Sequence, residues 1–176
     1  MERISSRTVY EGPIAGVRID EFLYADGSTA ERQVVSHPGA VVVVAHDERF
    51  VYLVRQPREA VGEEALLELP AGKLDVEGET PIDCARRELG EEIGRRAAEW
   101  RELRRFYTSP GLVEEEITLF LATDLTPADA ELGAEQRIEV VPWPLEDLDG
   151  AIAACRDAKS LVGLLLFRER RLAGGA

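Results

Sequence analysis

Four glutamates gather in one short segment of the chain, where they could bind a divalent cation. The segment GKLDVEGETPIDCARRELGEEIG, residues 72–94, carries Glu79, Glu88, Glu91 and Glu92. Carboxylates this close together repel one another, and solubility alone does not call for such clustering. A hard divalent cation takes oxygen ligands and would make the cluster favourable. The segment therefore predicts a metal site, with a solvated acidic helix face as the plainer alternative.

A helix over Pro81–Ile93 is predicted to hold these glutamates. Thr80 is a good N-cap, and Pro81 then occupies the first helical position, where its missing N–H costs nothing. Asp83, three residues after the cap, can complete a weak capping box. Gly94 suits the left-handed residue that ends many helices. Local sequence signals thus define both ends of this helix.

The predicted helix has an apolar stripe with two carboxylates at its edge. Glu88 and Glu92 are four residues apart, so they lie one turn above the other. Arg87 is placed to pair with Glu91, which leaves Glu88 and Glu92 as the less compensated pair. The stripe itself consists of Ile82, Ala85, Leu89 and Ile93.

The elements around this helix predict a mixed α/β domain. Strands are predicted at 17–24, 31–36, 39–45, 50–56, 103–107, 117–122 and 138–142, and an Asp26-Gly27 turn joins the first two. Two more helices are predicted at 145–154 and 160–170; the second is apolar at its start and basic at its end. Residues 1–36 are expected to form a small antiparallel strand region, and residues 37–176 the main domain.

Composition and charge restrict the class of protein. A chain of 176 residues with 45% hydrophobic and 31% charged residues can bury a sizeable core. The formal charge of −13 argues against a nucleic-acid partner. The N-terminus lacks the apolar run of a secretory signal, and the apolar stretch 161–167 is too short to cross a bilayer. A cytoplasmic protein without a membrane partner is therefore expected.

Cysteine and histidine contribute little to the predicted chemistry. Cys84 falls in the predicted helix 81–93 and Cys155 follows directly on the later helix predicted at 145–154, so a disulfide framework is not expected. His37 and His46 lack metal-site spacing and are treated as structural or surface residues.

The acidic segment resembles the Nudix box, G-x5-E-x7-R-E-U-x-E-E-x-G-U, in which U is an aliphatic residue. It departs from the box at two positions: six residues instead of five separate Gly72 from Glu79, and Arg95 takes the last aliphatic position. An extra residue is tolerable in a glycine-containing turn, and a basic residue suits the C-terminal end of a helix. The matching positions are Glu79, Arg87, Glu88, Leu89, Glu91, Glu92 and Gly94.

The resemblance implies the Nudix fold, a mixed β-sheet sandwiched between helices. Three further segments are similar to the ADP-ribose pyrophosphatase branch of that family: LVRQPR at 53–58, LLELPAGKL at 66–74 and SPGLVEEEITLFLA at 109–122. The likeness covers roughly residues 8–170. Relatives in this branch are commonly homodimers in which the N-terminal strands help to build the partner's site, so a homodimer is implied.

The branch implies a set of metal ligands. The carbonyl oxygen of Ala71, the residue before the box glycine, would join the carboxylates of Glu88 and Glu92. Glu91 would take part when more than one ion binds. Glu79 would support the loop and, in some relatives, the metal network.

The branch also implies how the chain would bind a diphosphate. Arg87 matches an arginine that holds the box carboxylates in place. Arg58 matches a basic residue that contacts the diphosphate, with Arg55 and Glu68 beside it.

One loop glutamate is implied as the general base. Glu115, in the SPG loop, matches this position, but Glu114 and Glu116 flank it, and the resemblance leaves open which of the three acts. A positioned carboxylate that accepts a proton from water typically contributes about 10²–10⁴-fold to the rate.

The implied activity is Mg²⁺-dependent hydrolysis of ADP-ribose to AMP and ribose 5-phosphate. Mn²⁺ would also suit these oxygen ligands, whereas the lack of Cys/His clusters disfavours zinc. Two alternatives stay open. The substrate could be another nucleoside diphosphate derivative, such as a sugar nucleotide, NADH or FAD. The chain could also be a Nudix-fold binding module without turnover, although the complete R-E-x-x-E-E set argues against this.

Overall fold

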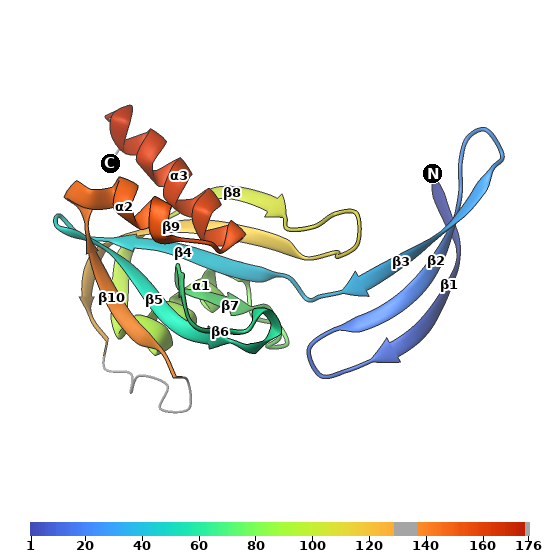
Figure 1. Ribbon diagram of the computed structural model, residues 1–176, viewed down its shortest axis with the longest axis horizontal. Coiled ribbons are helices and arrows are strands. Elements are labelled where there is room, and N and C mark those ends of the chain that lie inside the picture. The colour runs from blue at the N-terminus through green and yellow to red at the C-terminus, as the bar shows by residue number, and fades with distance from the viewer. Residues whose placement is uncertain (129–136, 175–176) are drawn as a thin grey trace. The chain divides into compact units, whose positions relative to one another are not determined.

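The computed structural model describes residues 1–128 and 137–174, which form two compact units (Figure 1). The smaller unit contains residues 1–39 and 106–116. The larger unit contains residues 40–105 and the described part of 117–176. Within the described residues, no helix is long and apolar enough to cross a membrane.

The smaller unit is built on an antiparallel sheet with the strand order β1-β2-β3. These strands are Glu2–Glu11, Gly16–Leu23 and Thr29–Ser36. The predicted turn between β2 and β3 is confirmed, and Gly27 adopts a φ of 82° there, a conformation that glycine reaches without strain. The sequence did not predict β1 as a strand. All of its residues are exposed, so it has no buried face that apolar alternation could reveal.

A buried aspartate ties β1 to β2. Asp20 is 1% exposed and accepts hydrogen bonds from Ser6 Oγ at 2.6 Å, Arg18 Nε at 2.8 Å and Arg3 Nη1 at 3.4 Å. Burial acts to raise the pKa of Asp20, but these hydrogen bonds outweigh burial and hold the pKa below its ordinary value. Asp20 is therefore ionised and paired across two strands.

Residues 106–116 join the same unit by pairing with β3. The Val35 N–H donates to the Leu112 carbonyl at 2.8 Å, and the Glu114 N–H donates to the Val35 carbonyl at 3.1 Å. Arg18 adds two hydrogen bonds to the Glu114 carboxylate, at 2.8 and 2.5 Å. The SPG loop is thus held by backbone pairing as well as by an ion pair.

The larger unit is a seven-stranded mixed sheet with helices on both sides (Figure 1). The strand order is β10-β5-β4-β9-β8, with β6 beside β5 and β7 beside β4. β4 is parallel to β9 and antiparallel to β5 and β7. The strands are β4 Ala40–His46, β5 Phe50–Arg58, β6 Glu63–Glu68, β7 Ala71–Lys73, β8 Arg95–Tyr107, β9 Glu116–Pro127 and β10 Glu139–Pro144. The predicted mixed sheet between helices is confirmed.

The valine run of β4 is buried on both faces. Val41, Val43 and Ala45 pack in a core cluster with apolar residues of α1 (Pro81–Ile93). Val44 points to the opposite face, near Gly163 of α3 (Ala158–Leu172). Because side chains alternate along a strand, α1 covers one face and α3 the other. This packing explains why β4 is apolar at every position but its last.

The C-terminal helices begin differently from the prediction. A 3₁₀ turn, Leu145–Asp147, precedes α2 (Leu148–Ala154), where one continuous helix was expected. α3 begins two residues earlier than predicted, because Asp157 acts as its N-cap and accepts a hydrogen bond from the Ser160 N–H at 3.0 Å. Another 3₁₀ turn, Glu59–Val61, follows β5.

Three strands of the larger unit differ from the prediction. β8 begins at Arg95 rather than at residue 103, and its first residues are mostly polar and exposed. β6 and β7 were not predicted, because one begins with two glutamates and the other has only three residues. Backbone pairing with neighbouring strands forms these elements, and local hydrophobicity does not reveal such pairing.

Candidate active site

The helix that carries the box glutamates forms as predicted. α1 spans Pro81–Ile93, the Thr80 hydroxyl accepts a hydrogen bond from the Asp83 N–H at 3.3 Å, and Gly94 is left-handed with φ of 64°. The capping box is modified, because the Asp83 carboxylate accepts from the Thr80 hydroxyl at 2.5 Å. These local contacts fix where the helix starts, and hence which of its residues face β7.

Two of the glutamates are buried against β7. Glu88 is 7% exposed and Glu92 is 4% exposed. Glu92 Oε2 accepts a hydrogen bond from the Ala71 N–H at 3.0 Å. The Glu88 carboxyl group lies so close to Gly72 that a Cβ at this position would collide with it. Position 72 therefore requires glycine, because the Glu88 carboxyl group occupies the space of a side chain there.

Arg87 holds three of the box carboxylates. Its Nε and Nη2 donate to Glu79 at 2.8 and 3.0 Å, and its Nη1 donates to Glu88 at 2.6 Å and to Glu91 at 3.3 Å. The predicted pair between Arg87 and Glu91 is confirmed, but the expectation that Glu88 is one of the less compensated carboxylates is wrong, because Arg87 also bonds to Glu88. The side chain reaches back along the helix to Glu79 in the preceding loop, a contact that helical spacing alone does not predict.

Glu92 is the least compensated of these acids. Burial is the main cause that raises its pKa, to about 8; the Ala71 hydrogen bond and the charge of Arg58 act against the rise, and Glu88 adds to it. Burial also raises the pKa of Glu88, against the attraction of Arg87. A cation beside both carboxylates would offset the cost of ionising them.

The donor set suits a hard divalent cation. Glu88, Glu91, Glu92 and the Ala71 carbonyl offer only oxygen atoms, which Mg²⁺ and Mn²⁺ prefer. In the described residues, no group of three or more His, Cys, Asp or Glu side chains is already gathered as a metal site. The chemistry of the residues therefore fits such an ion.

Arg58 is held by a buried glutamate. Its Nε and Nη2 donate to the two oxygens of Glu68 at 2.6 and 2.7 Å. Lys159 Nζ also donates to Glu68, at 2.7 Å. Arg55 lies apart from this pair and contacts the Glu139 carboxylate at 3.8 Å. The structure thus brings Arg58 and Glu68 together, but it does not bring Arg55 to them.

Sequence reasoning missed Lys159 and its neighbours. Asp157 caps α3 and accepts from Lys159 Nζ at 2.8 Å, and Ser160 Oγ accepts from the Leu69 N–H at 2.7 Å. The signal was present in the order Asp-x-x-Ser before an apolar run, which is typical of a helix start. What this turn contacts, however, depends on residues 91 positions earlier in the chain.

The expected base, Glu115, belongs to the smaller unit. Its Oε2 accepts from the Thr108 hydroxyl at 2.7 Å, and its Oε1 lies 3.5 Å from His37 Nδ1. That nitrogen also accepts from the Gly39 N–H at 3.1 Å, so in this arrangement it carries no proton to donate. Of the flanking acids, Glu114 is engaged by Arg18, and Glu116 begins β9. Glu115 is therefore less tightly engaged than Glu114.

The structure accounts for both departures from the box. The extra residue falls in an exposed turn where the Glu79 N–H donates to the Val76 carbonyl at 3.1 Å and Gly78 has a φ of 79°. The Arg95 guanidinium lies over the Tyr52 ring, 5.3 Å from its centroid, a favourable cation–π arrangement. Neither feature disturbs the contact between Gly72 and Glu88.

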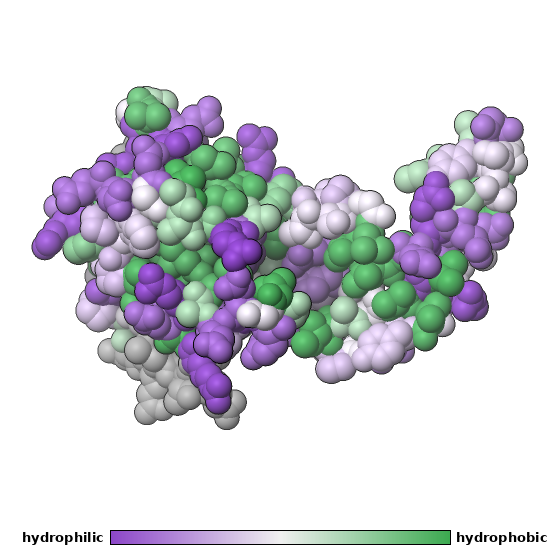
Figure 2. All heavy atoms as spheres, viewed as in Figure 1, coloured by the Kyte–Doolittle hydropathy of each residue, from purple (hydrophilic) through white to green (hydrophobic). Residues whose placement is uncertain are grey.

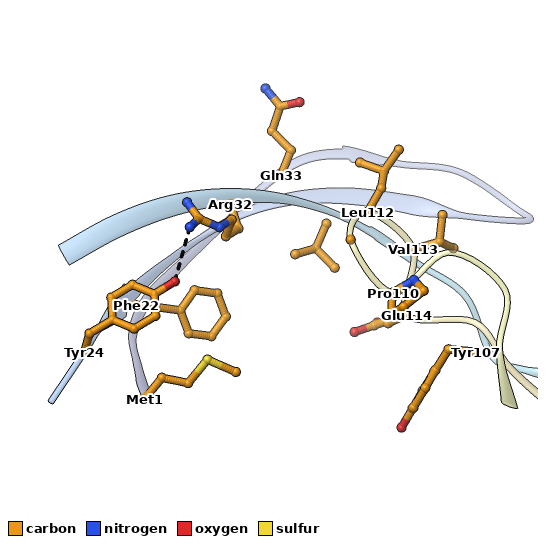
Figure 3. Close-up of a pocket in the computed structure, with 12 residues that line it drawn as sticks. Met1, Phe22, Tyr24, Arg32, Gln33, Tyr107, Pro110, Leu112, Val113 and Glu114 are labelled. Carbon is orange, nitrogen blue, oxygen red and sulfur yellow. Dashed lines mark hydrogen bonds between the residues drawn. The ribbon is translucent and has the colours of Figure 1, made fainter. Parts of the chain in front are cut away.

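A cavity of about 390 Å³ also lies within the smaller unit (Figure 3). Phe22, Tyr24 and Met1 lie together on one side of it, and Arg32 Nη2 donates to the Tyr24 hydroxyl at 3.2 Å. Leu112 and its neighbours in the loop line the other side. Aromatic and apolar walls with a few polar groups are common in ligand and partner sites.

Comparison with known proteins identifies the family. Residues 35–161 match the family model of the NUDIX domain. The chain belongs to the Nudix family and is a Nudix hydrolase. Members of this family generally use divalent metal ions, in agreement with the oxygen donors on α1.

Several similar relatives are pyrophosphatases. The ADP-ribose pyrophosphatase of Bacillus subtilis (strain 168) is 36% identical over 147 residues, which cover 82% of this chain and 78% of that protein. The ADP-ribose pyrophosphatase of Mycobacterium tuberculosis (strain H37Rv) is 43% identical over 125 residues, covering 70% of this chain and 60% of that protein. A GDP-mannose pyrophosphatase of Cronobacter sakazakii is 34% identical over 145 residues, covering 77% and 73%.

A solved structure supports the fold. The crystal structure of an ADP compounds hydrolase matches this chain with a TM-score of 0.84, covering 99% of this chain and 96% of that one. At 22% identity, this likeness concerns the fold alone.

Proposed function

We propose that this Nudix hydrolase cleaves the pyrophosphate bond of ADP-ribose with Mg²⁺ as its metal, and releases AMP and ribose 5-phosphate. One observation carries the proposal: the buried carboxyl groups of Glu92 and Glu88 contact Ala71 and Gly72 of the box. The chain that holds them is 36% identical, over 82% of its length, to an ADP-ribose pyrophosphatase. Mn²⁺ would fit the same oxygen ligands.

The box residues would hold the metal. Glu88, Glu92 and the Ala71 carbonyl would be its ligands, joined by Glu91 if a second ion binds. Arg87 bonds to Glu88 and to Glu79, so it would orient the carboxylates and limit their repulsion. When bound, the metal would withdraw negative charge from the diphosphate and orient it for attack.

Arg58 would contact the diphosphate. Glu68 fixes one edge of its guanidinium, while the side chain stays 40% exposed. A fixed guanidinium with an exposed edge suits a phosphate oxygen, because arginine donates several hydrogen bonds from one plane. Arg55 would contribute positive charge to substrate binding without a direct role in the chemistry.

Glu115 would act as the general base. A water oxygen forms a bond to one phosphorus, the bridging P–O bond breaks, and the proton from the water passes to the Glu115 carboxylate. The Thr108 hydroxyl would orient this carboxylate. Glu114 and Glu116 are the alternatives, and separate substitution of the three would identify the base.

A second substrate class deserves a direct comparison. The likeness to a GDP-mannose pyrophosphatase, 34% identical over 145 residues, favours a sugar nucleotide as the alternative. The same metal and arginine chemistry would apply, because both substrates contain a nucleoside diphosphate linkage. NADH and FAD share this linkage as well.

A product screen separates these possibilities. The purified chain with Mg²⁺ would be incubated with ADP-ribose, GDP-mannose, NADH and FAD, and products would be separated by ion-exchange chromatography. The proposal expects the highest kcat/KM for ADP-ribose, with AMP and ribose 5-phosphate in equal amounts. A higher value for GDP-mannose would transfer the assignment to sugar nucleotides. Tight binding of ADP-ribose without turnover would indicate a binding module.

We also propose that the chain acts as a cytoplasmic homodimer, with residues 1–36 as the dimerisation and substrate-contact region and residues 37–176 as the hydrolase domain. Figure 2 shows apolar residues among polar ones on the surface of the smaller unit, and its exposed apolar side chains include Ile4, Val9, Tyr10 and Ile14. Such side chains favour burial against a partner. Light scattering after size exclusion would test this, and a monomer at micromolar concentration would contradict it.

A further inference from the structure

The buried carboxylate of Glu68 receives three charged hydrogen bonds. Oε1 accepts from Arg58 Nε at 2.6 Å, and Oε2 accepts from Arg58 Nη2 and Lys159 Nζ, each at 2.7 Å. Glu68 is the last residue of β6 and is 1% exposed. A carboxylate that is almost fully removed from water needs such partners, because a buried charge is costly when it is unpaired.

The contact with Glu68 leaves part of Arg58 available for an anion. The two hydrogen bonds to Glu68 use Nε and Nη2 of Arg58. Among the described residues, none accepts a hydrogen bond from Nη1. Since the side chain is 40% exposed, an anion from solvent can approach the remaining donors. The direction of these donors depends on how firmly Glu68 is held.

Lys159 holds Glu68 from the first turn of α3. Its ammonium group lies 2.7 Å from Glu68 Oε2 and 2.8 Å from Asp157 Oδ2, and the side chain is only 15% exposed. Two carboxylates therefore occupy this ammonium group, so it contacts a bound substrate less readily than Arg58 does. Its effect on a substrate would pass through Glu68.

The packing of α3 does not require this contact. Asp157 already caps the helix by accepting from the Ser160 N–H at 3.0 Å and from Ser160 Oγ at 2.5 Å. Independently, the N–H of Leu69, the residue after β6, donates to Ser160 Oγ at 2.7 Å. The hydrogen bond from Lys159 to Glu68 is therefore not needed to cap α3 or to hold it against Leu69.

We propose that Lys159 is a positioning residue that holds Glu68, and through Glu68 orients Arg58 to bind the diphosphate of the substrate. This inference rests on the proposed function, since it assigns Arg58 to an anionic group. Charge supports it: the two cations, Arg58 and Lys159, balance the two anions, Glu68 and Asp157. Loss of Lys159 would leave one cation, Arg58, with the two carboxylates of Glu68 and Asp157.

Lys159→Met tests the inference, because it removes the charge and keeps much of the side-chain length. We expect KM for ADP-ribose to rise by about 10-fold while kcat changes by less than about 2-fold, since uniform binding is what the residue supports. Lys159→Arg should restore most of the affinity. Arg156→Met is the matched control, because Arg156 pairs with Glu63 of the same strand but is 75% exposed.

A double variant separates positioning from a structural role. In an Arg58→Met background, Lys159→Met should raise KM no further, because the group that it orients is gone. Additive losses, an unchanged KM in the single variant, or a fall in kcat alone would overturn the inference. If Lys159→Met does not fold, as judged by circular dichroism, Lys159→Gln replaces it with the same expectations.

The substrate assignment and the role of Lys159 can be tested separately. If wild-type protein hydrolyses GDP-mannose instead of ADP-ribose, the substrate assignment fails, and the same KM comparison on GDP-mannose tests Lys159. If wild-type protein binds ADP-ribose without turnover, calorimetric titration should show a Kd about 10-fold weaker in Lys159→Met. Failure of the wild-type protein to bind any of the diphosphates would overturn both.

Discussion

Among single residues, Glu92 of α1 is the buried acid whose carboxylate contacts the backbone of β7. Its carboxylate is buried, accepts the Ala71 N–H and has a pKa raised to about 8, chiefly by burial. Such a group prefers to be protonated until a cation or another positive charge approaches. As the proposed metal ligand, Glu92 would therefore couple ion binding to the loss of a proton.

Glu92→Gln should remove turnover and keep the fold. We expect kcat for ADP-ribose to fall by at least about 100-fold, the usual cost of losing a group that stabilises transition-state charge. The amide oxygen can still accept the Ala71 N–H, and near pH 7 the metal-free acid is mostly neutral as well, so thermal unfolding should change little. Steady-state kinetics and circular dichroism would measure both effects.

Glu77→Gln is the control, because Glu77 is exposed in the loop before the same helix. It should leave kcat within about 2-fold of wild type, in keeping with a solvated charge. A kcat near the wild-type value in Glu92→Gln would falsify the assignment of Glu92 as a principal ligand.

Gly72→Ala should damage the site through a steric clash. The new Cβ would collide with the Glu88 carboxyl group and push it away. We expect a loss of about 1–3 kcal/mol in the free energy of unfolding and a drop of at least about 10-fold in kcat/KM. Urea unfolding and kinetics would measure the two.

Gly78→Ala, in the same loop, separates strain from the clash. Gly78 has a positive φ but open space around its Cβ direction, so the variant should cost about 1–2 kcal/mol from backbone strain alone. Activity should be retained. Equal losses of activity in both glycine variants would mean that loop strain, and not contact with Glu88, controls the site.

At the scale of elements, hydrogen bonds between strands define the smaller unit more than burial does. β1 is exposed throughout, yet Ser6 and Arg3 of β1 reach Asp20 of β2. One ionised, buried aspartate thus links two strands that share little apolar contact. The stability of this sheet should depend on the charge of Asp20.

Asp20→Asn should destabilise the sheet at neutral pH and have little effect in acid. The pKa of Asp20 is held below its ordinary value, so its contribution is present above the unfolded-state pKa, about 3.9, and is lost as pH falls through the lower folded-state pKa. We expect a loss of about 1–3 kcal/mol at pH 7. Hydrogen exchange of β1 amides between pH 7 and pH 3 would follow it.

Glu31→Gln serves as the comparison, since Glu31 is an exposed residue of β3. Its effect should be within about 0.5 kcal/mol at every pH. A loss in Asp20→Asn that stays constant down to pH 3 would contradict an ionised Asp20.

At the scale of the whole molecule, net charge and metal binding act together. The chain carries a formal charge of −13, which repels an anionic substrate and strains the compact state. Divalent ions on the box carboxylates would reduce both effects locally. The protein is therefore expected to be more stable with its metal than without it.

Mg²⁺ should stabilise the protein by mass action. At about 100 times its dissociation constant, a specifically bound ion adds about 2.7 kcal/mol to the free energy of unfolding. Differential scanning calorimetry with increasing Mg²⁺ would measure the shift, and Glu92→Gln should lose most of it. NaCl at equal ionic strength controls for general screening, and an equal shift with NaCl would argue against a specific site.

Local sequence signals are enough to define the box helix. Thr80, Pro81 and Gly94 act within one or two turns, so the limits of α1 follow from local chemistry. The spacing of the glutamates followed with it, and so did the family. The valine run of β4 likewise predicted a buried strand, because its apolar character reflects burial on both faces.

The contacts among the site residues, in contrast, arise only when distant segments pack together. Arg87 donates hydrogen bonds to Glu79 and Glu88, and Gly72 leaves room for the Glu88 carboxyl group because it has no side chain. Lys159 bonds to Glu68, which lies 91 positions earlier in the chain. β1, β6 and β7 form by pairing with other strands. Contacts of this kind depend on the packing of distant segments, which local spacing does not encode.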